Sequence, residues 1–245
     1  MGLVRIKGIV IKVANSSEND KILTVLTAEK GKIKVFCKGA KKTKSAFLAS
    51  TEFLSYSDLM LYEGSGDLYN LNSAETINVF YNLRTDLKKL TYASLIAQII
   101  FDVSMEEEVA QKRLQLLLNT LYVIAETDKD LDFVISIFKI RLLGLLGYIP
   151  RLKTCVSCNK EVKDMREEIY FSIKDNGIKC GECKKLDKGA IQISYTTYTS
   201  ILYIITSDPK KTYSFEVPKE VINELNLVSQ IFLNEKLEKE YKLSF

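Results

Sequence analysis

The chain has 245 residues, of which 47% are hydrophobic and 27% charged, and it contains no histidine. This composition supplies enough apolar side chains for a buried core and excludes an intrinsically disordered protein. The missing histidine removes the commonest general base, the usual serine and cysteine triads and every histidine-containing metal motif, so we do not expect an enzyme.

Neither the first residues nor the longest apolar segment indicates a secreted or membrane protein. The sequence starts Met1-Gly2-Leu3-Val4-Arg5, without the charged and apolar regions of a secretory signal. Residues 131–146 are strongly apolar, but they include Lys139 and Arg141 and are shorter than the roughly 20 residues of a membrane span. We therefore expect a cytoplasmic protein in which residues 131–146 form a buried helix.

The first 80 residues show the short apolar alternation that is typical of β-strands. Strands are expected at residues 3–14, 21–28, 32–38, 53–62 and 68–74, with a hairpin turn at Glu29-Lys30-Gly31. Five short strands favour a small barrel, and among five-stranded barrels the OB-fold, which binds oligonucleotides, is the leading candidate. The apolar register changes at Gly8, which predicts a glycine bulge at that position.

Charge is unevenly distributed along this predicted barrel. Residues 1–45 contain 11 Lys or Arg and 3 acidic residues, whereas residues 46–80 contain 5 acidic residues and no basic one. In the third strand Ile33, Val35 and Cys37 would point inward, so the residues between them form an outer row of lysines with one aromatic. Such a row suits single-stranded nucleic acid, because cations neutralise phosphates and an aromatic ring stacks on bases.

The candidate DNA-binding residues combine this row with the basic loop that follows it and with two neighbours on the first strand. They are Arg5, Lys7, Lys32, Lys34, Phe36, Lys38, Lys41, Lys42 and Lys44. For any single lysine an ordinary solvated surface, or protection of a sheet edge, explains the residue equally well. A weaker excess of basic residues, 12 against 7 acidic, covers residues 139–189.

From residue 81 the apolar spacing becomes helical. One helix is expected over residues 83–100 with Asn82 or Thr85 as its cap, a second over 114–125 and a third from about residue 130. The third is apolar nearly all round and should be the centre of a bundle. Two further helices are expected at residues 195–206 and 218–239. The predicted domains are an OB-fold (1–79), a helical domain in two parts (80–151 and 189–245) and an inserted zinc ribbon (152–188).

The ribbon is indicated by two cysteine pairs, Cys155 with Cys158 and Cys180 with Cys183, separated by 21 residues. This spacing is close to that of four-cysteine zinc sites, in which each pair grips the same ion. Disulfides, iron–sulfur chemistry, redox centres and plain thiols are the alternatives, and a reducing compartment disfavours the first. Four thiolates close the coordination shell of zinc, so we expect one structural Zn²⁺ per chain. The fifth cysteine, Cys37, is expected to be an inert core thiol.

Two sets of segments, one in each half of the chain, recur together in a known family. In the C-terminal half they are residues 141–150 (RLLGLLGYIP), the two cysteine pairs, Phe171 and Gly177. In the N-terminal half they are residues 19–27 (NDKILTVLT), Gly31, residues 38–40, Lys44 and residues 74–75. In this order and spacing they resemble the bacterial DNA repair protein RecO family. One departure is Asn176 before Gly177, where the family often has two glycines; asparagine tolerates the left-handed backbone of such a turn.

The resemblance implies a recombination mediator that binds single- and double-stranded DNA and anneals complementary strands. It also implies that the protein works with RecR, and functionally with RecF, to load RecA onto DNA coated by single-stranded DNA-binding protein. A groove for the C-terminal tail of that coating protein and an association with the bacterial nucleoid are implied as well. The alternatives are a generic nucleic-acid-binding OB and zinc-ribbon protein without mediator activity, and a zinc enzyme.

Overall fold

The computed structural model describes residues 2–64, 68–165 and 168–243. Within this part the chain forms two compact units, of which one ends at Thr127 and the other runs from Asp128 to Lys242. The first unit contains a β-barrel and three helices, and the second contains three helices of 12 to 19 residues, two short helical turns and a small sheet. The four domains expected from the sequence stay a prediction.

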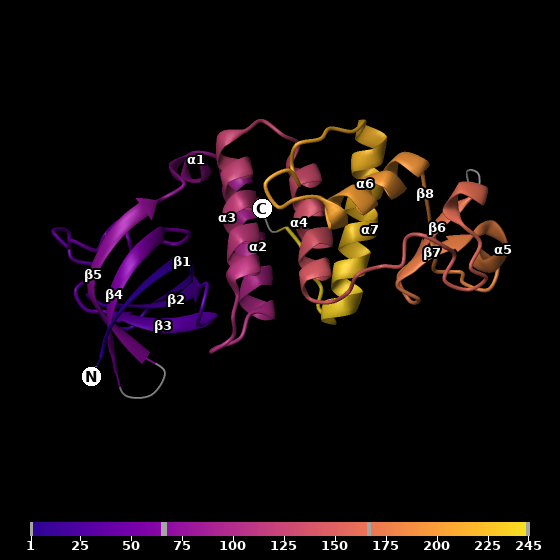
Figure 1. The fold of residues 1–245 in the computed structure, drawn as a ribbon. Helices are drawn as coiled ribbons and strands as arrows, with labels where there is room; N and C mark the ends of the chain where they lie inside the picture. The colour runs from indigo at the N-terminus through magenta and orange to yellow at the C-terminus, as the bar shows by residue number, and fades with distance from the viewer. Residues whose placement is uncertain (1, 65–67, 166–167, 244–245) are drawn as a thin grey trace. The chain divides into compact units, whose positions relative to one another are not determined.

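The barrel at the indigo end of the chain has five strands (Figure 1). They are β1 (Leu3–Asn15), β2 (Lys21–Thr27), β3 (Lys32–Cys37), β4 (Tyr56–Glu63) and β5 (Leu68–Asn78). The closed order is β1-β2-β3-β5-β4, in which β3 and β5 are parallel and the other pairs antiparallel. This is the five-stranded barrel of the OB-fold that the sequence predicts. Its interior is filled by alternating side chains such as Val25, Val35 and Leu59.

The first strand closes the barrel by pairing with both β2 and β4. Gly8 lies where the two pairings overlap, and a Cβ atom there would come within 2.4 Å of a methyl group of Val25. The irregularity of the strand, however, lies between Val10 and Lys12, so the bulge predicted at Gly8 occurs at Ile11 instead. The predicted position of the bulge was therefore wrong, and Gly8 is required by the close approach of β2 instead.

Helices α1 (Tyr81–Arg84), α2 (Leu87–Val103) and α3 (Gln111–Glu126) complete the first unit. The carboxylate of Asp86 caps α2 by accepting from the main-chain N–H groups of Lys88 and Lys89, a role expected for Asn82 or Thr85. Helix α2 packs on β1 and α3 packs on β2. They cover Ile9 and Leu26, which are fully buried although they lie outside the barrel's own core cluster. The outer face of the sheet is therefore covered at one end.

The linker between α2 and α3 is attached to the hairpin turn that joins β2 to β3. The N–H groups of Lys32 and Glu107 donate to the carbonyls of Met105 and Lys30, at 2.9 and 3.0 Å. Gly31 in this turn has φ of +61°, and a Cβ atom there would overlap the carbonyl of Met105. A glycine is therefore needed for both the turn and the linker, and barrel and helices form one packed unit.

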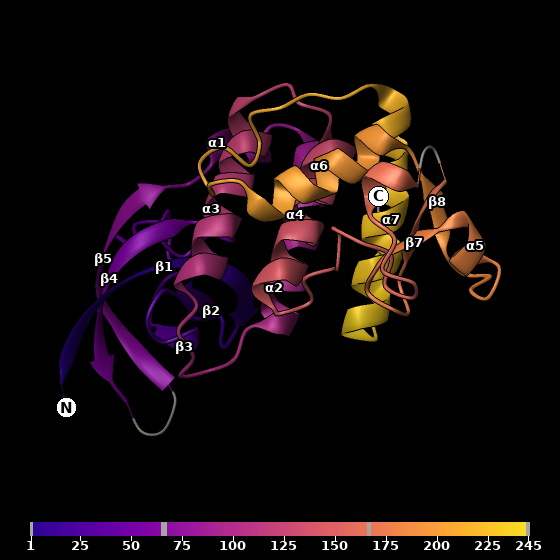
Figure 2. The same cartoon turned by 45° about the vertical axis from the view of Figure 1, so that its right-hand side comes forward.

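The second unit is built on α4 (Leu131–Leu145), α6 (Tyr195–Thr206) and α7 (Lys219–Leu237), which pack on one another (Figures 1 and 2). Helix α4 is buried on nearly every side, as its sequence predicts. Asp130 caps its first turn through the N–H groups of Asp132 and Phe133. No helix in the described ranges is both long and apolar enough to cross a membrane.

The ribbon within this unit has three short strands and two short helical turns. They are β6 (Ile169–Ser172), β7 (Gly177–Cys180) and β8 (Ile191–Ile193) in the order β7-β6-β8, with η1 (Val162–Asp164) and α5 (Gly181–Lys184). The ring of Phe171 on β6 meets the ring of Phe232 on α7 edge-on, with centroids 5.3 Å apart. Asn176 has φ of +52°, which confirms the left-handed turn expected beside Gly177.

Candidate metal centre and nucleic-acid interface

The four cysteines of the ribbon lie together, with their sulfur atoms within 4.8 Å of one another. Cys155 and Cys158 belong to the turn before η1, Cys180 ends β7, and Cys183 lies in α5. The Sγ atoms of Cys158 and Cys180 are 3.7 Å apart. Zinc–sulfur bonds of about 2.3 Å in a tetrahedron place the sulfurs about 3.8 Å apart, so the cluster has the size of a zinc site.

The backbone around the cluster favours the thiolate of Cys155, whereas burial and the neighbouring thiols raise the pKa of Cys183 to about 12. Burial raises the pKa of the Cys155 thiol, but the main-chain N–H groups of Cys158, Cys180 and Ser157 outweigh this and lower the pKa to about 6. Four sulfurs at this separation repel one another as thiolates unless a cation lies between them. The predicted ligand set can therefore hold a metal ion. Cys37 is fully buried in the barrel core, where burial raises its pKa to about 12, in agreement with the inert thiol expected.

The candidate DNA-binding residues fall into three groups in the structure. Arg5 forms a bidentate pair with Asp58, at 3.0 Å for both contacts, and Lys34 pairs with Glu106 at 3.1 Å. The ammonium of Lys32 donates to the carbonyl oxygen of Phe101 at 2.7 Å. The others lie on the surface, exposed except for the half-buried Phe36: Lys7, Phe36, Lys38, Lys41, Lys42 and Lys44.

Lys32 differs most from its predicted role. Its side chain is on the outer face of β3, as the alternation indicates, but α2 covers this end of the face. Burial lowers its pKa, and its ammonium lies 4.3 Å from the ring centre of Phe101. Lys32 therefore joins the barrel to the helix. The sequence pattern could not show this, because it does not reveal which part of the outer face a later helix covers.

The uncovered part of the outer face contains cations that the strand register brings together. Lys12 on β1 is opposite Thr24 on β2, and Thr24 is opposite Lys34 on β3. The neighbouring row, Ala14, Ile22 and Phe36, is assembled in the same way. Lys12 was not among the predicted residues. Its place between the apolar Ile11 and Val13 was the signal that it faces outward.

The basic loop after β3 is fixed at its base by the loop between β1 and β2. Asp20 accepts a hydrogen bond from the N–H of Gly39 at 2.7 Å, and the N–H of Lys41 donates to the carbonyl of Asn19 at 3.0 Å. The Gly39 N–H and the hydroxyl of Ser17 lower the pKa of Asp20, so its carboxylate is charged at neutral pH. The ammonium of Lys41 donates to the carbonyl of Ser17 at 3.3 Å.

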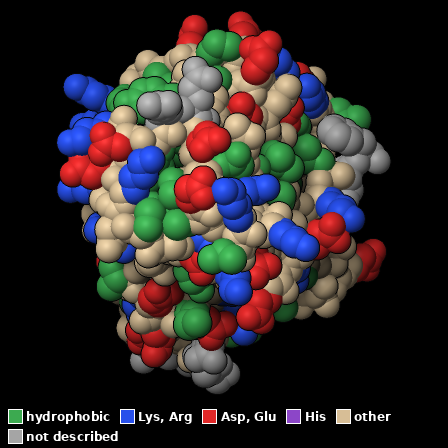
Figure 3. Space-filling model, turned by 90° about the vertical axis from the view of Figure 1, so that its right-hand side faces the viewer, with side chains coloured by type: hydrophobic (Ala, Val, Ile, Leu, Met, Phe, Trp, Pro, Cys, Tyr) green, Lys and Arg blue, Asp and Glu red, His purple; other side chains and the backbone are tan. Residues whose placement is uncertain are grey.

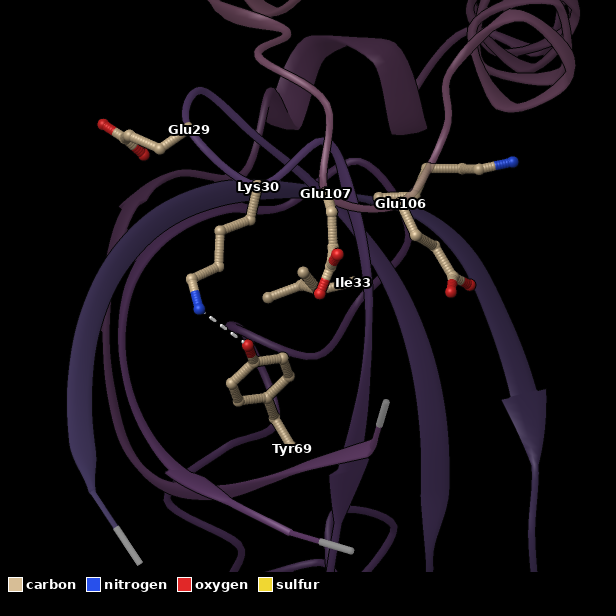
Figure 4. A pocket seen from close by; sticks show the side chains of 7 residues that line it. Glu29, Lys30, Ile33, Tyr69, Glu106 and Glu107 are labelled. Carbon is tan, nitrogen blue, oxygen red and sulfur yellow. Dashed lines mark hydrogen bonds between the residues drawn. The ribbon is translucent and has the colours of Figure 1, made fainter. Parts of the chain in front are cut away.

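An acidic pocket marks the other end of β3 (Figure 4). It has a volume of about 500 Å³ and is lined by Glu29, Glu106 and Glu107 together with Lys30, Lys32, Ile33 and Tyr69. The ammonium of Lys30 points to the hydroxyl of Tyr69, 2.9 Å away. The three carboxylates outnumber the two lysines of this pocket, so a polyanion would lie toward the loop end of the strand.

The excess of basic residues around the ribbon does not form a comparable surface on the face shown in Figure 3, where basic, acidic and apolar side chains are interspersed. Lys179 is almost fully buried and pairs with Asp175 and with Asp187, the latter at 3.0 Å. Basic residues of this region thus partly serve the ribbon itself.

Comparisons with known proteins cover the whole length of the chain. Residues 1–80 match the family model described as Recombination protein O N terminal, and residues 84–244 match Recombination protein O C terminal. The chain is 41% identical over 246 aligned residues to the DNA repair protein RecO of Acetivibrio thermocellus, covering 100% of this chain and 96% of the relative. The RecO protein of Clostridium perfringens is 32% identical, over 96% of this chain and 93% of the relative. That of Alkaliphilus metalliredigens is 31% identical, over 94% of this chain and 92% of the relative.

Proposed function

This chain belongs to the RecO family of DNA repair proteins, and we propose that it acts as a recombination mediator. We propose that it does so in the cytoplasm, in association with the nucleoid. In this role it binds single- and double-stranded DNA and anneals complementary strands. With RecR it helps RecA to load onto DNA coated by single-stranded DNA-binding protein, whose C-terminal tail it binds, and RecF contributes functionally. The protein carries out no catalysis, because annealing requires no covalent chemistry.

The observation that supports this function best is the exposed basic loop beside an uncovered barrel face. Lys38, Lys41, Lys42 and Lys44 are exposed, and the base of their loop is fixed by Asp20. Annealing requires two polyanions to approach, so their phosphates must be neutralised while the base edges stay free to pair. Flexible lysines on a fixed loop suit this task, because an ammonium contacts phosphate without reading sequence.

Of the predicted DNA-binding residues, we assign the direct contacts to this loop, Lys7, Lys34 and Phe36. The Lys34 ion pair with Glu106 is exposed on both sides and contributes little, so a phosphate can replace the carboxylate. Arg5 and Lys32 are assigned a supporting role, since Asp58 and the carbonyl of Phe101 already bind their charged groups.

The metal that we propose for the cysteine cluster is one Zn²⁺ with a structural role. Its ligands would be Cys155, Cys158, Cys180 and Cys183, whose sulfurs are spaced for this ion. Zinc would cross-link the turn before η1 to the end of β7 and to α5. Four thiolates leave no position for water, so the ion has no catalytic part.

The test is the annealing of complementary strands that have been coated with single-stranded DNA-binding protein. Duplex formation is timed with the full chain, without it, and with a variant in which Lys41, Lys42 and Lys44 are changed to Glu. The proposal expects the chain to accelerate annealing and the variant to lose most of this effect. If the chain binds both DNA forms but does not accelerate annealing, it is a generic nucleic-acid binder instead.

A further inference from the structure

A groove in the first unit, where β1 faces α2, contains an aromatic ring flanked by cations. The groove has a volume of about 520 Å³, and Lys12, Val13, Phe53, Gln98 and Phe101 are among the residues that line it. Phe53 and Phe101 are only half-buried, so part of each ring faces the groove. This volume lies in the range of pockets that take small ligands, and it accommodates a nucleobase.

Two ammonium groups lie against the ring of Phe101, and they differ in freedom. Lys32 is 4.3 Å from the ring centre and is fixed by its hydrogen bond to the carbonyl of the same residue. Lys12 is 4.8 Å from the ring centre, and its side chain is exposed. A cation–π contact at an exposed site is weak, so an incoming group can displace Lys12 while Lys32 stays.

The groove also adjoins the basic face described above. Lys12 belongs to the cross-strand row with Thr24 and Lys34, so a strand that crosses this row passes the opening of the groove. A polyanion on the row would bring its bases beside Phe101. Stacking of a base on an aromatic ring is stronger than the contact that Lys12 would give up.

We propose that this groove binds one unpaired base of a single strand, stacked on Phe101, while Lys12 moves from the ring to a neighbouring phosphate. The inference rests on the proposed DNA-binding function and adds to it a subsite that selects single strands. In a duplex every base is already stacked and paired, so the subsite stays empty. When annealing pairs the bound base, the contact with Phe101 is lost, which favours release of the product.

Phe101→Leu tests this subsite, because it removes the ring but keeps an apolar side chain and the main-chain carbonyl that binds Lys32. Fluorescence anisotropy measures the affinities for a short oligothymidine and for a duplex of equal length. We expect the oligothymidine to bind about tenfold more weakly and the duplex affinity to change less than about twofold. The matched control is Tyr122→Leu, which removes an aromatic ring that is 57% exposed on α3. It should leave both affinities unchanged.

The absence of tryptophan from the chain permits a second, direct test. Phe101→Trp introduces a single tryptophan whose fluorescence a stacked base should quench. Oligothymidine should quench it, whereas a strand of abasic sites and a duplex should not. Tyr122→Trp, again the control, should respond to none of them.

The outcomes separate this inference from the proposed function. If the unmodified chain binds neither form of DNA, the proposed function fails. If it binds both forms, but Phe101→Leu leaves their affinity ratio unchanged or the tryptophan is not quenched, only the base-binding groove is refuted.

Discussion

Neutralising the loop lysines is the sharpest test of where DNA binds. In Lys41→Gln/Lys42→Gln both substituted side chains are exposed, and the loop keeps its main-chain contacts with Asn19 and Asp20. For single strands each phosphate contact contributes about 0.7 to the slope of log affinity against log salt, so two lost contacts flatten the slope by about 1.4. Over a fourfold rise in salt, the unmodified chain should therefore lose about sevenfold more affinity than the variant.

The assay is a titration of labelled oligothymidine with protein at several salt concentrations. Lys210→Gln/Lys211→Gln is the control, because it also removes two charges from an adjacent, exposed lysine pair. Its slope should equal that of the unmodified chain. An unchanged slope for the loop variant would refute the loop as a phosphate-binding site. An equal loss in both variants would mean that net charge, and not the position of the lysines, determines binding.

Three further predictions concern stability and metal content. Cys155→Ser should reduce bound zinc from one ion per chain to near none, as measured by elemental analysis. The control Cys37→Ala should retain the zinc. Full retention by the serine variant would contradict the ligand assignment. Gly8→Ala should lower the free energy of unfolding by about 1–3 kcal/mol, because its Cβ atom would overlap the neighbouring strand. At Gly144 a Cβ atom would meet nothing within 4 Å, so Gly144→Ala should raise the free energy of unfolding by about 0.5–1 kcal/mol. Denaturant unfolding that ranks the two variants in the opposite order would contradict the packing. Burial lowers the pKa of Lys139 from 10.5 to about 8. Between pH 8 and 10.5 the folded chain therefore binds fewer protons than the unfolded chain, so the free energy of unfolding should rise as the pH is raised through this range. Denaturant unfolding at several pH values should show this rise, and Lys139→Met should remove it.

Local patterns in the sequence were enough to predict the five barrel strands, the longer helices and the cysteine cluster. Residues 195–206 form α6 as expected, because apolar spacing and the Ser194 cap agree there. The two cysteine pairs meet where the turn that contains Cys155 and Cys158 lies against the end of β7 and the start of α5. The five strands were placed within a few residues, since alternation is a property of each strand alone. The resemblance to the family supplied the function that these patterns leave open.

Features that depend on contacts between distant segments were not predictable in the same way. The outward position of Lys32 was correct, but only the packing of α2 shows that Phe101 receives its ammonium. The pairing of Arg5 with Asp58 joins residues 53 positions apart, and no sequence pattern links them. Phe101 lies just beyond the helix predicted over residues 83–100, and no sequence pattern singled it out. The DNA contact proposed for it depends on the position of its ring beside Lys12.

The two helices that cover Ile9 and Leu26 have a consequence for how the protein is made. The N-terminal family match ends at residue 80, but a fragment that stops there would expose both side chains to water. The β-domain can therefore reach its native stability only after α3, which ends at Glu126, has left the ribosome and packed. During synthesis the nascent barrel would carry an apolar strip that chaperones can recognise.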